Sequence, residues 1–332
     1  MELLENLPFS KFCSLNITDK AKFYCEVSNV DELKEILEFS KKDSLEQLII
    51  GDGTNLVPTQ PFNGVIIKNN TRGIKRLDDL TLEVSSGENW DNFVKWTINN
   101  GLYGLENLAL IPGTVGAGPI QNIGAYGTEI SRYIQSISCV DIKDGSHHEF
   151  NNEECDFGYR TSVFKEKKNL FILSVTFKLS KTPKLNYSYD SLREEIDFND
   201  IKGDLLSPMD MYELVSKVRN RKLPNYIDRP NVGSFFKNIY LTKEDFLQLN
   251  LPFEIPIFQE KGLYKIPTAL ILQETGWKGK RMGNIGISDK HSLVLITYDK
   301  VKGSEVLSFT ERVIDDVYLK TGLKLEVEPT FV

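Results

Sequence analysis

Residues 111–127 read IPGTVGAGPIQNIGAYG and form the most glycine-rich part of the sequence. Five glycines and two prolines fall within its seventeen residues. Glycine permits positive φ and lets backbone N–H groups come close to an anion, so such a loop suits a phosphate-bearing ligand. The Gly-Lys-Ser/Thr of a Walker loop does not follow, which excludes that class of nucleotide site. The stretch predicts phosphate groups held by the backbone.

A second glycine cluster, GDGTN at residues 51–55, follows the apolar run 48–50. Leu56 occupies the third glycine position of a dinucleotide fingerprint, and Pro58 and Pro61 come soon after it. Because no helix can begin there to meet a pyrophosphate, we exclude a Rossmann site. A plain connection from a strand into a turn is the alternative interpretation of this cluster.

Composition narrows the class of protein. A chain of 332 residues predicts about two domains, and a formal charge of −7 gives no field that would attract nucleic acid or anionic lipid. The N-terminal residues lack the pattern of a secretory signal, and no apolar run reaches membrane-spanning length. The four cysteines are widely spaced, and the chain has only three histidines. We therefore expect a cytoplasmic protein with reduced thiols and without a metal, nucleic-acid or membrane partner.

Apolar spacing predicts a mixture of helices and strands. Helices are expected over 28–39, begun by Ser28 with Asp31, over 90–98, ended by Gly101, from Pro208 onward, and over 306–317. Short strands are expected at 48–50, 65–67 and 81–85, and antiparallel strands at 136–141 and 175–179. Residues 181–203 show little apolar periodicity and are our candidate for a domain junction.

A longer segment, residues 104–127, resembles the flavin-binding core of the UDP-N-acetylenolpyruvoylglucosamine reductase family. Further matches follow in the family's order and span nearly the whole chain, at residues 51–55, 87–90, 157–165, 233–238 and 325–331. The resemblance implies noncovalent FAD, NADPH as hydride donor, and reduction of UDP-N-acetylglucosamine enolpyruvate to UDP-N-acetylmuramate for peptidoglycan. A monomer is expected.

The resemblance also implies an α+β fold. Its FAD-binding region would be of the vanillyl-alcohol-oxidase (PCMH) type in two subdomains, over residues 15–182. A junction at 183–206 and a smaller α+β substrate-binding domain at 207–332 would follow. The residues implied to hold FAD are Gly51, Asp52, Gly53, Thr54, Asn55, Pro112, Gly113, Thr114, Gly116, Gln121, Asn122, Gly124, Ala125, Tyr126 and Gly127.

Three residues match the family's catalytic positions. Hydride addition at the enolpyruvyl C3 builds negative charge at C2 and the carboxylate, which a fixed guanidinium and an acid can stabilise. The resemblance implies this role for Arg160 and Glu328, and it implies that Ser234 donates the proton to C2. Without the family, these would be a surface arginine, a turn serine and a solvated carboxylate. On period-two spacing, Glu328 would share a polar strand face with Lys324 and Glu326.

The same comparison implies substrate or NADPH contacts from Tyr189, Arg219, Lys222, Asn238 and Lys278. Arg219 and Lys222 lie three residues apart near a predicted helix end, where two cations could meet a diphosphate or simply complement the helix dipole.

The sequence departs from the family pattern at residues 11–15, KFCSL, and at Ser288 and His291. These departures affect the packing of the N-terminal segment and the nicotinamide or diphosphate contacts more than the core chemistry. A flavin oxidase on the same fold is one alternative function, against which Ser234, Glu328 and the UDP-sugar residues argue. A noncatalytic nucleotide-sugar-binding protein is the other, and the presence of all three catalytic residues argues against it.

Overall fold

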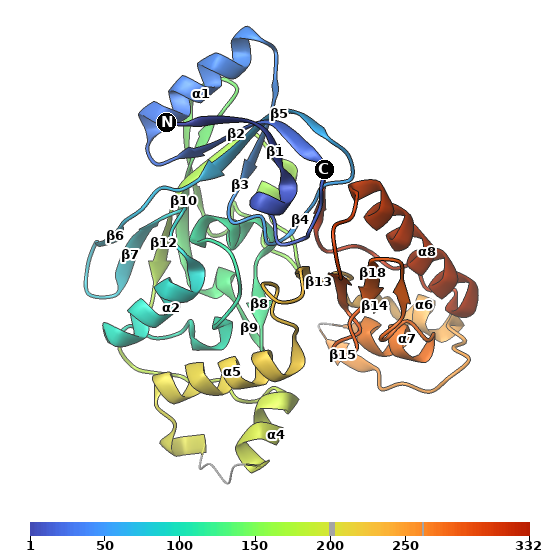
Figure 1. Cartoon of the computed structure of the whole chain (residues 1–332). Helices are drawn as coiled ribbons and strands as arrows, with labels where there is room; N and C mark the ends of the chain where they lie inside the picture. The colour runs from blue at the N-terminus through green and yellow to red at the C-terminus, as the bar shows by residue number, and fades with distance from the viewer. Residues whose placement is uncertain (199–202, 261) are drawn as a thin grey trace. The chain divides into compact units, whose positions relative to one another are not determined.

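The structure is a computed structural model that describes residues 1–198, 203–260 and 262–332 (Figure 1). It divides into two compact units. Unit 1 comprises Met1–Asn6, Lys22–Asp52 and Asn63–Arg221, and unit 2 comprises Leu7–Ala21, Gly53–Phe62 and Lys222–Val332. Each unit is therefore built from three separate pieces of the chain. In the described ranges, no helix has the length and apolar character that crossing a membrane requires.

The first sheet has the order β1-β2-β5-β3, from strands β1 (Leu3–Pro8), β2 (Lys20–Val27), β5 (Phe62–Asn69) and β3 (Glu46–Ile50). The expected strands at 48–50 and 65–67 are confirmed, and they pair in parallel with Leu48 opposite Ile66. Helix α1 (Val30–Lys42) contributes Leu33 and Ile36 to the same core.

The predicted cap of α1 is wrong by one residue. Asn29, rather than Ser28, is the N-cap, and its side chain accepts hydrogen bonds from the N–H groups of Asp31 and Glu32. Glu32 returns a bond by accepting from the N–H of Ser28 at 2.7 Å. Asparagine caps a helix as well as serine does, and this register places a glutamate where it can reach back.

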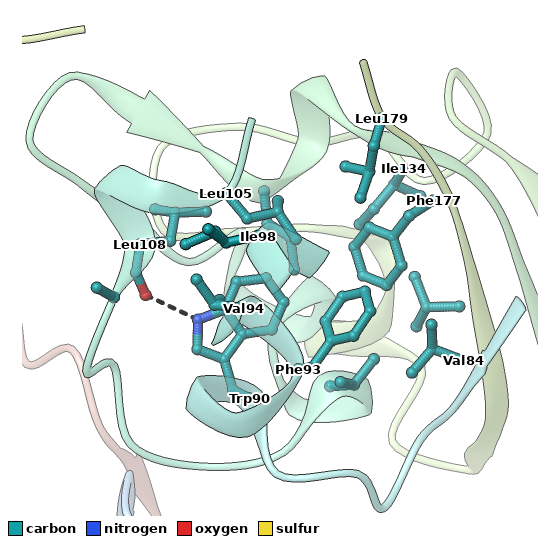
Figure 2. Close-up of a cluster of buried hydrophobic side chains, with 14 of the residues drawn as sticks. Val84, Trp90, Phe93, Val94, Ile98, Leu105, Leu108, Ile134, Phe177 and Leu179 are labelled. Carbon is teal, nitrogen blue, oxygen red and sulfur yellow. Dashed lines mark hydrogen bonds between the residues drawn. The ribbon is translucent and has the colours of Figure 1, made fainter. Parts of the chain in front are cut away.

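The second sheet has the order β11-β10-β12-β7-β6. Its strands are β11 (His147–Asn151), β10 (Ile134–Asp141), β12 (Leu170–Lys178), β7 (Thr81–Ser85) and β6 (Ile74–Arg76), all paired antiparallel. Helix α2 (Trp90–Asn99) packs Trp90, Phe93 and Val94 into one core with Phe177 of β12 (Figure 2). The rings of Phe93 and Phe177 lie 5.0 Å apart.

Two further helices of unit 1 lie after β12. Helix α4 (Asp190–Phe198) falls inside the stretch expected as a junction, and its Leu192 and Ile196 are buried in the core of unit 1. Residues 199–202 of that stretch lie outside the described residues. Helix α5 (Pro208–Lys222) begins as predicted, because the side chains of Ser207 and Asp210 each accept the other residue's backbone N–H.

Shorter elements complete unit 1 between α2 and β12. They are η2 (Glu106–Leu108), η3 (Val115–Ala117), η4 (Pro119–Gln121), β8 (Gly124–Ala125), β9 (Thr128–Glu129), η5 (Ile130–Arg132) and α3 (Val163–Glu166). After α4 comes η6 (Gly203–Leu205).

Unit 2 holds a four-stranded antiparallel sheet of order β13-β19-β18-β17. Its strands are β13 (Asn231–Ser234), β19 (Val294–Thr297), β18 (Ile285–Ile287) and β17 (Arg281–Met282). A second sheet, of order β14-β16-β15, consists of β14 (Ile239–Leu241), β16 (Leu263–Ile266) and β15 (Phe258–Glu260).

The helices of unit 2 are η1 (Phe9–Lys11), α6 (Lys243–Gln248), α7 (Thr268–Glu274) and α8 (Gly303–Thr321). The predicted last helix is confirmed as α8, which buries Val306, Phe309 and Val313 and ends at Gly322 in the left-handed conformation. Strand β20 (Thr330–Phe331) pairs in parallel with β4 (Leu56–Val57).

Candidate active site

The glycine-rich stretch of residues 111–127 folds into short 3₁₀ turns followed by the β8–β9 hairpin. Two predicted FAD-binding glycines have no room for a side chain. A Cβ on Gly116 would lie 1.7 Å from Ser86 Oγ, and a Cβ on Gly51 would lie 2.7 Å from Thr114 Oγ1. The N–H of Gly116 also donates to the carbonyl of Ser86 at 2.8 Å. Glycine at these positions is required by the close approach of neighbouring chain segments.

Four residues of this region that are not glycine have positive φ. They are Leu110 (φ +54°), Asn122 (φ +48°), Tyr126 (φ +48°) and Arg160 (φ +54°). Backbone of this kind persists only where its surroundings hold it, and it concentrates at binding and catalytic sites. Three of the four were predicted from the sequence as site residues.

The chemistry of residues 111–127 fits an anionic cofactor. The stretch contains no aspartate or glutamate. Thr114 and Asn122 are buried, and the amide of Asn122 donates to the carbonyl of Gly158 at 3.1 Å. A segment of close-packed backbone, hydroxyl and amide groups without a carboxylate suits the pyrophosphate of FAD.

The second glycine cluster is fixed at both of its ends. In unit 1, Asp52 lies 3.6 Å from Lys68 Nζ. In unit 2, Gly53 has φ +64°, and a Cβ there would lie 2.1 Å from the carbonyl oxygen of Phe12. The N–H of Ser14 donates to the carbonyl of Gly53 at 3.3 Å. The N-terminal segment that departs from the family pattern therefore packs directly against this cluster.

Arg160 lies against the glycine-rich stretch. Its Nη2 donates to the carbonyl of Gly124 at 2.9 Å, and its guanidinium lies 5.4 Å from the ring of Tyr159. The structure thus brings the predicted catalytic arginine to a predicted cofactor-binding residue. The hydrogen bond to a backbone carbonyl fixes the direction of the guanidinium without neutralising it.

Arg219 of α5 belongs to the same group of side chains. Burial lowers the pKa of Arg219, the charges of Tyr126 and Asp91 raise it, and the charge of Arg160 lowers it further. The rings of Tyr126 and Tyr189 meet edge to face, with centroids 5.5 Å apart. Unit 1 therefore gathers two guanidinium groups and two phenols, all predicted from the sequence, which is a donor set suited to phosphate and carboxylate groups.

In unit 2, backbone pairing places the segments that carry Ser234 and Glu328 next to each other. Phe236 forms an antiparallel bridge with Val327, and the N–H of Glu328 donates to the carbonyl of Phe235 at 2.9 Å. Ser234 ends β13, after Gly233 with φ +74° at a break in the strand's register. The two predicted catalytic residues of this unit consequently lie on adjoining segments.

The expectation that Glu328 shares an exposed polar face with Lys324 and Glu326 is wrong. Lys324 and Glu326 are exposed, whereas Glu328 is 8% exposed. The alternation ends where residues 326–328 begin to pair with residues 235–237. Burying a carboxylate costs free energy unless the group is paired or hydrogen-bonded. The burial of Glu328 therefore distinguishes it from an ordinary solvated glutamate.

The remaining predicted substrate residues lie in unit 2. Asn238 Oδ1 accepts from the N–H of Thr268 at 3.2 Å, at the start of α7. Lys222 and Lys278 both act on His291, whose pKa is lowered first by burial and then by these two charges. His291 Nδ1 accepts from the N–H of Leu293 at 3.2 Å. One of the departures from the family pattern therefore lies among the predicted binding lysines.

Ser288, the other departure in that segment, is buried, and its hydroxyl accepts from the N–H of Lys290 at 3.1 Å. Its place is in a turn. The four cysteines of the chain are free, and across the described ranges no cluster of three His, Cys, Asp or Glu residues could hold a metal ion.

Sequence reasoning missed Asn107. This buried residue uses both hydrogens of its amide, donating to the carbonyl of Tyr126 at 3.0 Å and to the carbonyl of Asn186 at 2.6 Å. It thereby fastens the end of the glycine-rich stretch to the segment that carries Tyr189. One partner lies 79 residues away in sequence, so no local pattern could have found the link.

Known protein families match both the N-terminal and the C-terminal part of this chain. The FAD binding domain family matches residues 21–151, and the C-terminal domain of UDP-N-acetylenolpyruvoylglucosamine reductase matches residues 225–332. The reductase of that name from Flavobacterium johnsoniae is 39% identical over 99% of both chains. This chain belongs to the UDP-N-acetylenolpyruvoylglucosamine reductase family. It is an FAD-dependent oxidoreductase, as the resemblance implied.

Other members of the reductase family are similar to this chain over nearly its whole length. The enzyme from Burkholderia ambifaria is 37% identical over 100% of this chain and 97% of its own length. The crystal structure of UDP-N-acetylenolpyruvylglucosamine reductase from Thermus caldophilus superposes with a TM-score of 0.70 at 21% identity, covering 100% of this chain and 99% of that one. These findings confirm the predicted α+β fold, with a flavin-binding region of the vanillyl-alcohol-oxidase type and a smaller second part.

Proposed function

We propose that this reductase converts UDP-N-acetylglucosamine enolpyruvate to UDP-N-acetylmuramate with NADPH as the electron donor. The observation that carries the proposal is the joining, in one chain, of the FAD-binding match and the reductase C-terminal match, in relatives that cover its full length. When bound, FAD supplies hydride acceptance and donation. The residues of the chain bind, orient and protonate the substrate.

Arg160 is proposed to bind the carboxylate of the enolpyruvyl group. Its guanidinium donates a hydrogen bond to the carbonyl of Gly124, which holds it against the glycine-rich stretch. When a hydride adds to C3, negative charge develops on C2 and spreads to the carboxylate. A fixed cation aimed at that charge stabilises the transition state more than the ground state, which is the requirement for catalysis.

Ser234 is proposed to complete the reduction by giving its hydroxyl proton to C2. The C2=C3 double bond then becomes a single bond, with the hydride at C3 and the proton at C2. A hydroxyl is a weak acid, so the transfer depends on a strongly basic carbon and close positioning. The support from geometry is the end of β13, where the left-handed Gly233 turns the chain just before Ser234.

Glu328 is proposed to stabilise the enol form of the intermediate. Its burial and its place beside Phe235 support this role, since a carboxyl held next to the segment of Ser234 can act on the same atoms. Arg219 and Tyr189 of unit 1, and Lys222, Asn238 and Lys278 of unit 2, are proposed to bind the UDP part or NADPH. Residues 207–332 remain our proposal for the substrate-binding domain, with 183–206 as the junction after the FAD-binding region at 15–182.

The cytoplasmic location is part of this proposal and is supported by the four free cysteines. A monomer stays a prediction, to be checked by light scattering. The test of the function itself is a visible spectrum of the purified protein. We expect a flavin spectrum that bleaches with NADPH under anaerobic conditions and returns on addition of the enolpyruvyl substrate. Return of the spectrum with oxygen but not with the substrate would favour the oxidase alternative, and a colourless protein that fails to bind FAD would refute both.

A further inference from the structure

Asp91, in the first turn of α2, contacts groups from three parts of unit 1. Its Oδ1 accepts from the N–H of Leu110 at 2.7 Å, and both carboxylate oxygens lie 2.9 Å from the hydroxyl of Tyr212, which donates to them. Lys95 Nζ lies 3.0 Å from Oδ2. The Asp91 side chain is 16% exposed. Hydrogen bonds to a charged group that water reaches poorly are among the stronger ones in proteins.

The bond to Leu110 fixes the entry to the glycine-rich stretch. Leu110 has φ +54° and immediately precedes residues 111–127. The neighbouring Trp90 donates its indole N–H to the carbonyl of Leu108 at 2.8 Å, as Figure 2 shows. The backbone N–H of Trp90 donates to the carbonyl of Gly113 at 3.0 Å. The first turn of α2 therefore holds the stretch on both sides of its start.

The bond to Tyr212 connects the same carboxylate to α5. Tyr212 precedes Arg219 by seven residues, or about two helical turns, so both side chains leave the same face of the helix. Arg219 in turn is within electrostatic reach of Asp91, Tyr126 and Arg160. One carboxylate thus bonds to Leu110, the residue just before the glycine-rich stretch, and to Tyr212 of the helix that carries Arg219.

We infer that Asp91 is a positioning residue for substrate binding, which acts through Tyr212 to hold α5, the helix that carries Arg219, against the start of the glycine-rich stretch. The inference rests on the proposed role of Arg219 in binding the diphosphate. A residue with a merely structural role would change unfolding without selective loss of substrate affinity. A positioning role raises KM while kcat and flavin binding stay nearly constant, and it does so only while Arg219 is present.

The test is a double-mutant cycle of Tyr212→Phe and Arg219→Gln in the full-length holoenzyme. Tyr212→Phe removes the link to α5 and leaves the bond between Asp91 and Leu110 in place. Couplings through packed networks of this kind change affinity by about 3- to 30-fold. The dissociation constant of UDP-N-acetylglucosamine, measured by calorimetry, and KM for the enolpyruvyl substrate should therefore rise by about that factor in Tyr212→Phe. In the Arg219→Gln background the same substitution should add nothing.

Independent, additive losses in the two variants would overturn the inference, and so would an unchanged dissociation constant in Arg219→Gln. Asp91→Asn removes the charge that Tyr212 contacts and should also raise the dissociation constant. The matched control is Glu213→Gln, at the exposed residue that follows Tyr212 on α5, with an expected change of less than about twofold. Turnover of the wild type is measured separately, so a failure of the proposed reaction is distinguished from a failure of the binding cycle.

Discussion

The backbone N–H of Glu328 donates to the carbonyl of Phe235 at 2.9 Å, and this bond sets a buried carboxylate beside the residue that follows Ser234. The two residues are separated by 93 positions in the chain, from 235 to 328, yet the pairing leaves them adjoining. The bond itself is made by the main chain of both residues and not by the carboxylate. Substitutions of the carboxylate can therefore test its chemistry while this main-chain bond is kept.

We predict that Ser234→Ala leaves flavin reduction by NADPH nearly intact and slows flavin reoxidation by the enolpyruvyl substrate. The loss of a general acid costs about 10² to 10⁴ in rate. Anaerobic stopped-flow absorbance separates the two half-reactions. Ser304→Ala, at an exposed serine of α8 in the same unit, is the control and should change neither rate. Equal slowing of both half-reactions would show that Ser234 has another role.

Gly116→Ala should abolish flavin binding, because the new methyl group would lie 1.7 Å from Ser86 Oγ and must displace the glycine-rich stretch. The ratio of flavin to protein absorbance measures the loss. Ser86→Gly removes the two nearest atoms and should restore part of the binding in the double variant. Gly145→Ala strains the backbone at φ +77°, but its methyl group meets nothing within 4 Å, so this variant should keep its flavin. Full flavin occupancy in Gly116→Ala would contradict the steric argument.

Glu195 of α4 is 1% exposed and pairs with Lys217 Nζ at 2.9 Å and with the guanidinium of Arg221, both on α5. Glu195→Gln should lower the free energy of unfolding by about 1–3 kcal/mol, as expected when a charged, buried hydrogen-bonding group loses its charge. Urea denaturation followed by circular dichroism gives the value. Glu194→Gln changes the adjacent, exposed glutamate and should have almost no effect. Equal effects at the two positions would rule out a special role for the α4–α5 pair.

The pKa of His291 is lowered by burial and by the charges of Lys222 and Lys278, which sets the sign of a pH effect. In the unfolded chain its pKa returns to about 6.5, so below that pH the unfolded state binds more protons than the folded state. The stability contributed by neutral His291 is full above pH ~6.5 and is lost as the pH falls through the folded-state pKa. His291→Gln should therefore make the free energy of unfolding less dependent on pH below about pH 6.5. The free energy of unfolding is measured by urea denaturation at a series of pH values. If its dependence on pH were the same in His291→Gln and in the wild type, this prediction would be contradicted.

Local chemistry allowed much of the fold to be predicted. The caps and stops of α5 and α8 are made by neighbouring residues, as with Ser207, Asp210 and Gly322, and the structure confirms them. Helix α4 was not predicted, because its buried face includes Glu195, which interrupts the apolar pattern between Leu192 and Ile196. Its partners Lys217 and Arg221 lie on another helix, and a periodicity argument has no means to see them.

In the candidate site, too, some features could be predicted from sequence motifs, whereas others depend on contacts between distant segments. Family-like motifs placed Arg160, Tyr126, Tyr189 and Arg219, which the structure gathers in unit 1. The supporting contacts of Asn107 depend on segments brought together only by folding, and local spacing does not encode them. The burial of Glu328 is of the same kind, since it follows from pairing with a strand about ninety residues away.

The three-piece construction of unit 2 constrains the order in which this chain can fold during its synthesis. The piece that ends at Phe62 leaves the ribosome 160 residues before Lys222, which begins the last piece. At about 5–20 residues per second, the early pieces wait roughly 8–30 s for their partners. Unit 1 is complete in sequence only at Arg221, so it can assemble as a whole while the last piece of unit 2, from Lys222 onward, is being translated. The nascent chain therefore carries β4 without this pairing partner until β20 has been translated.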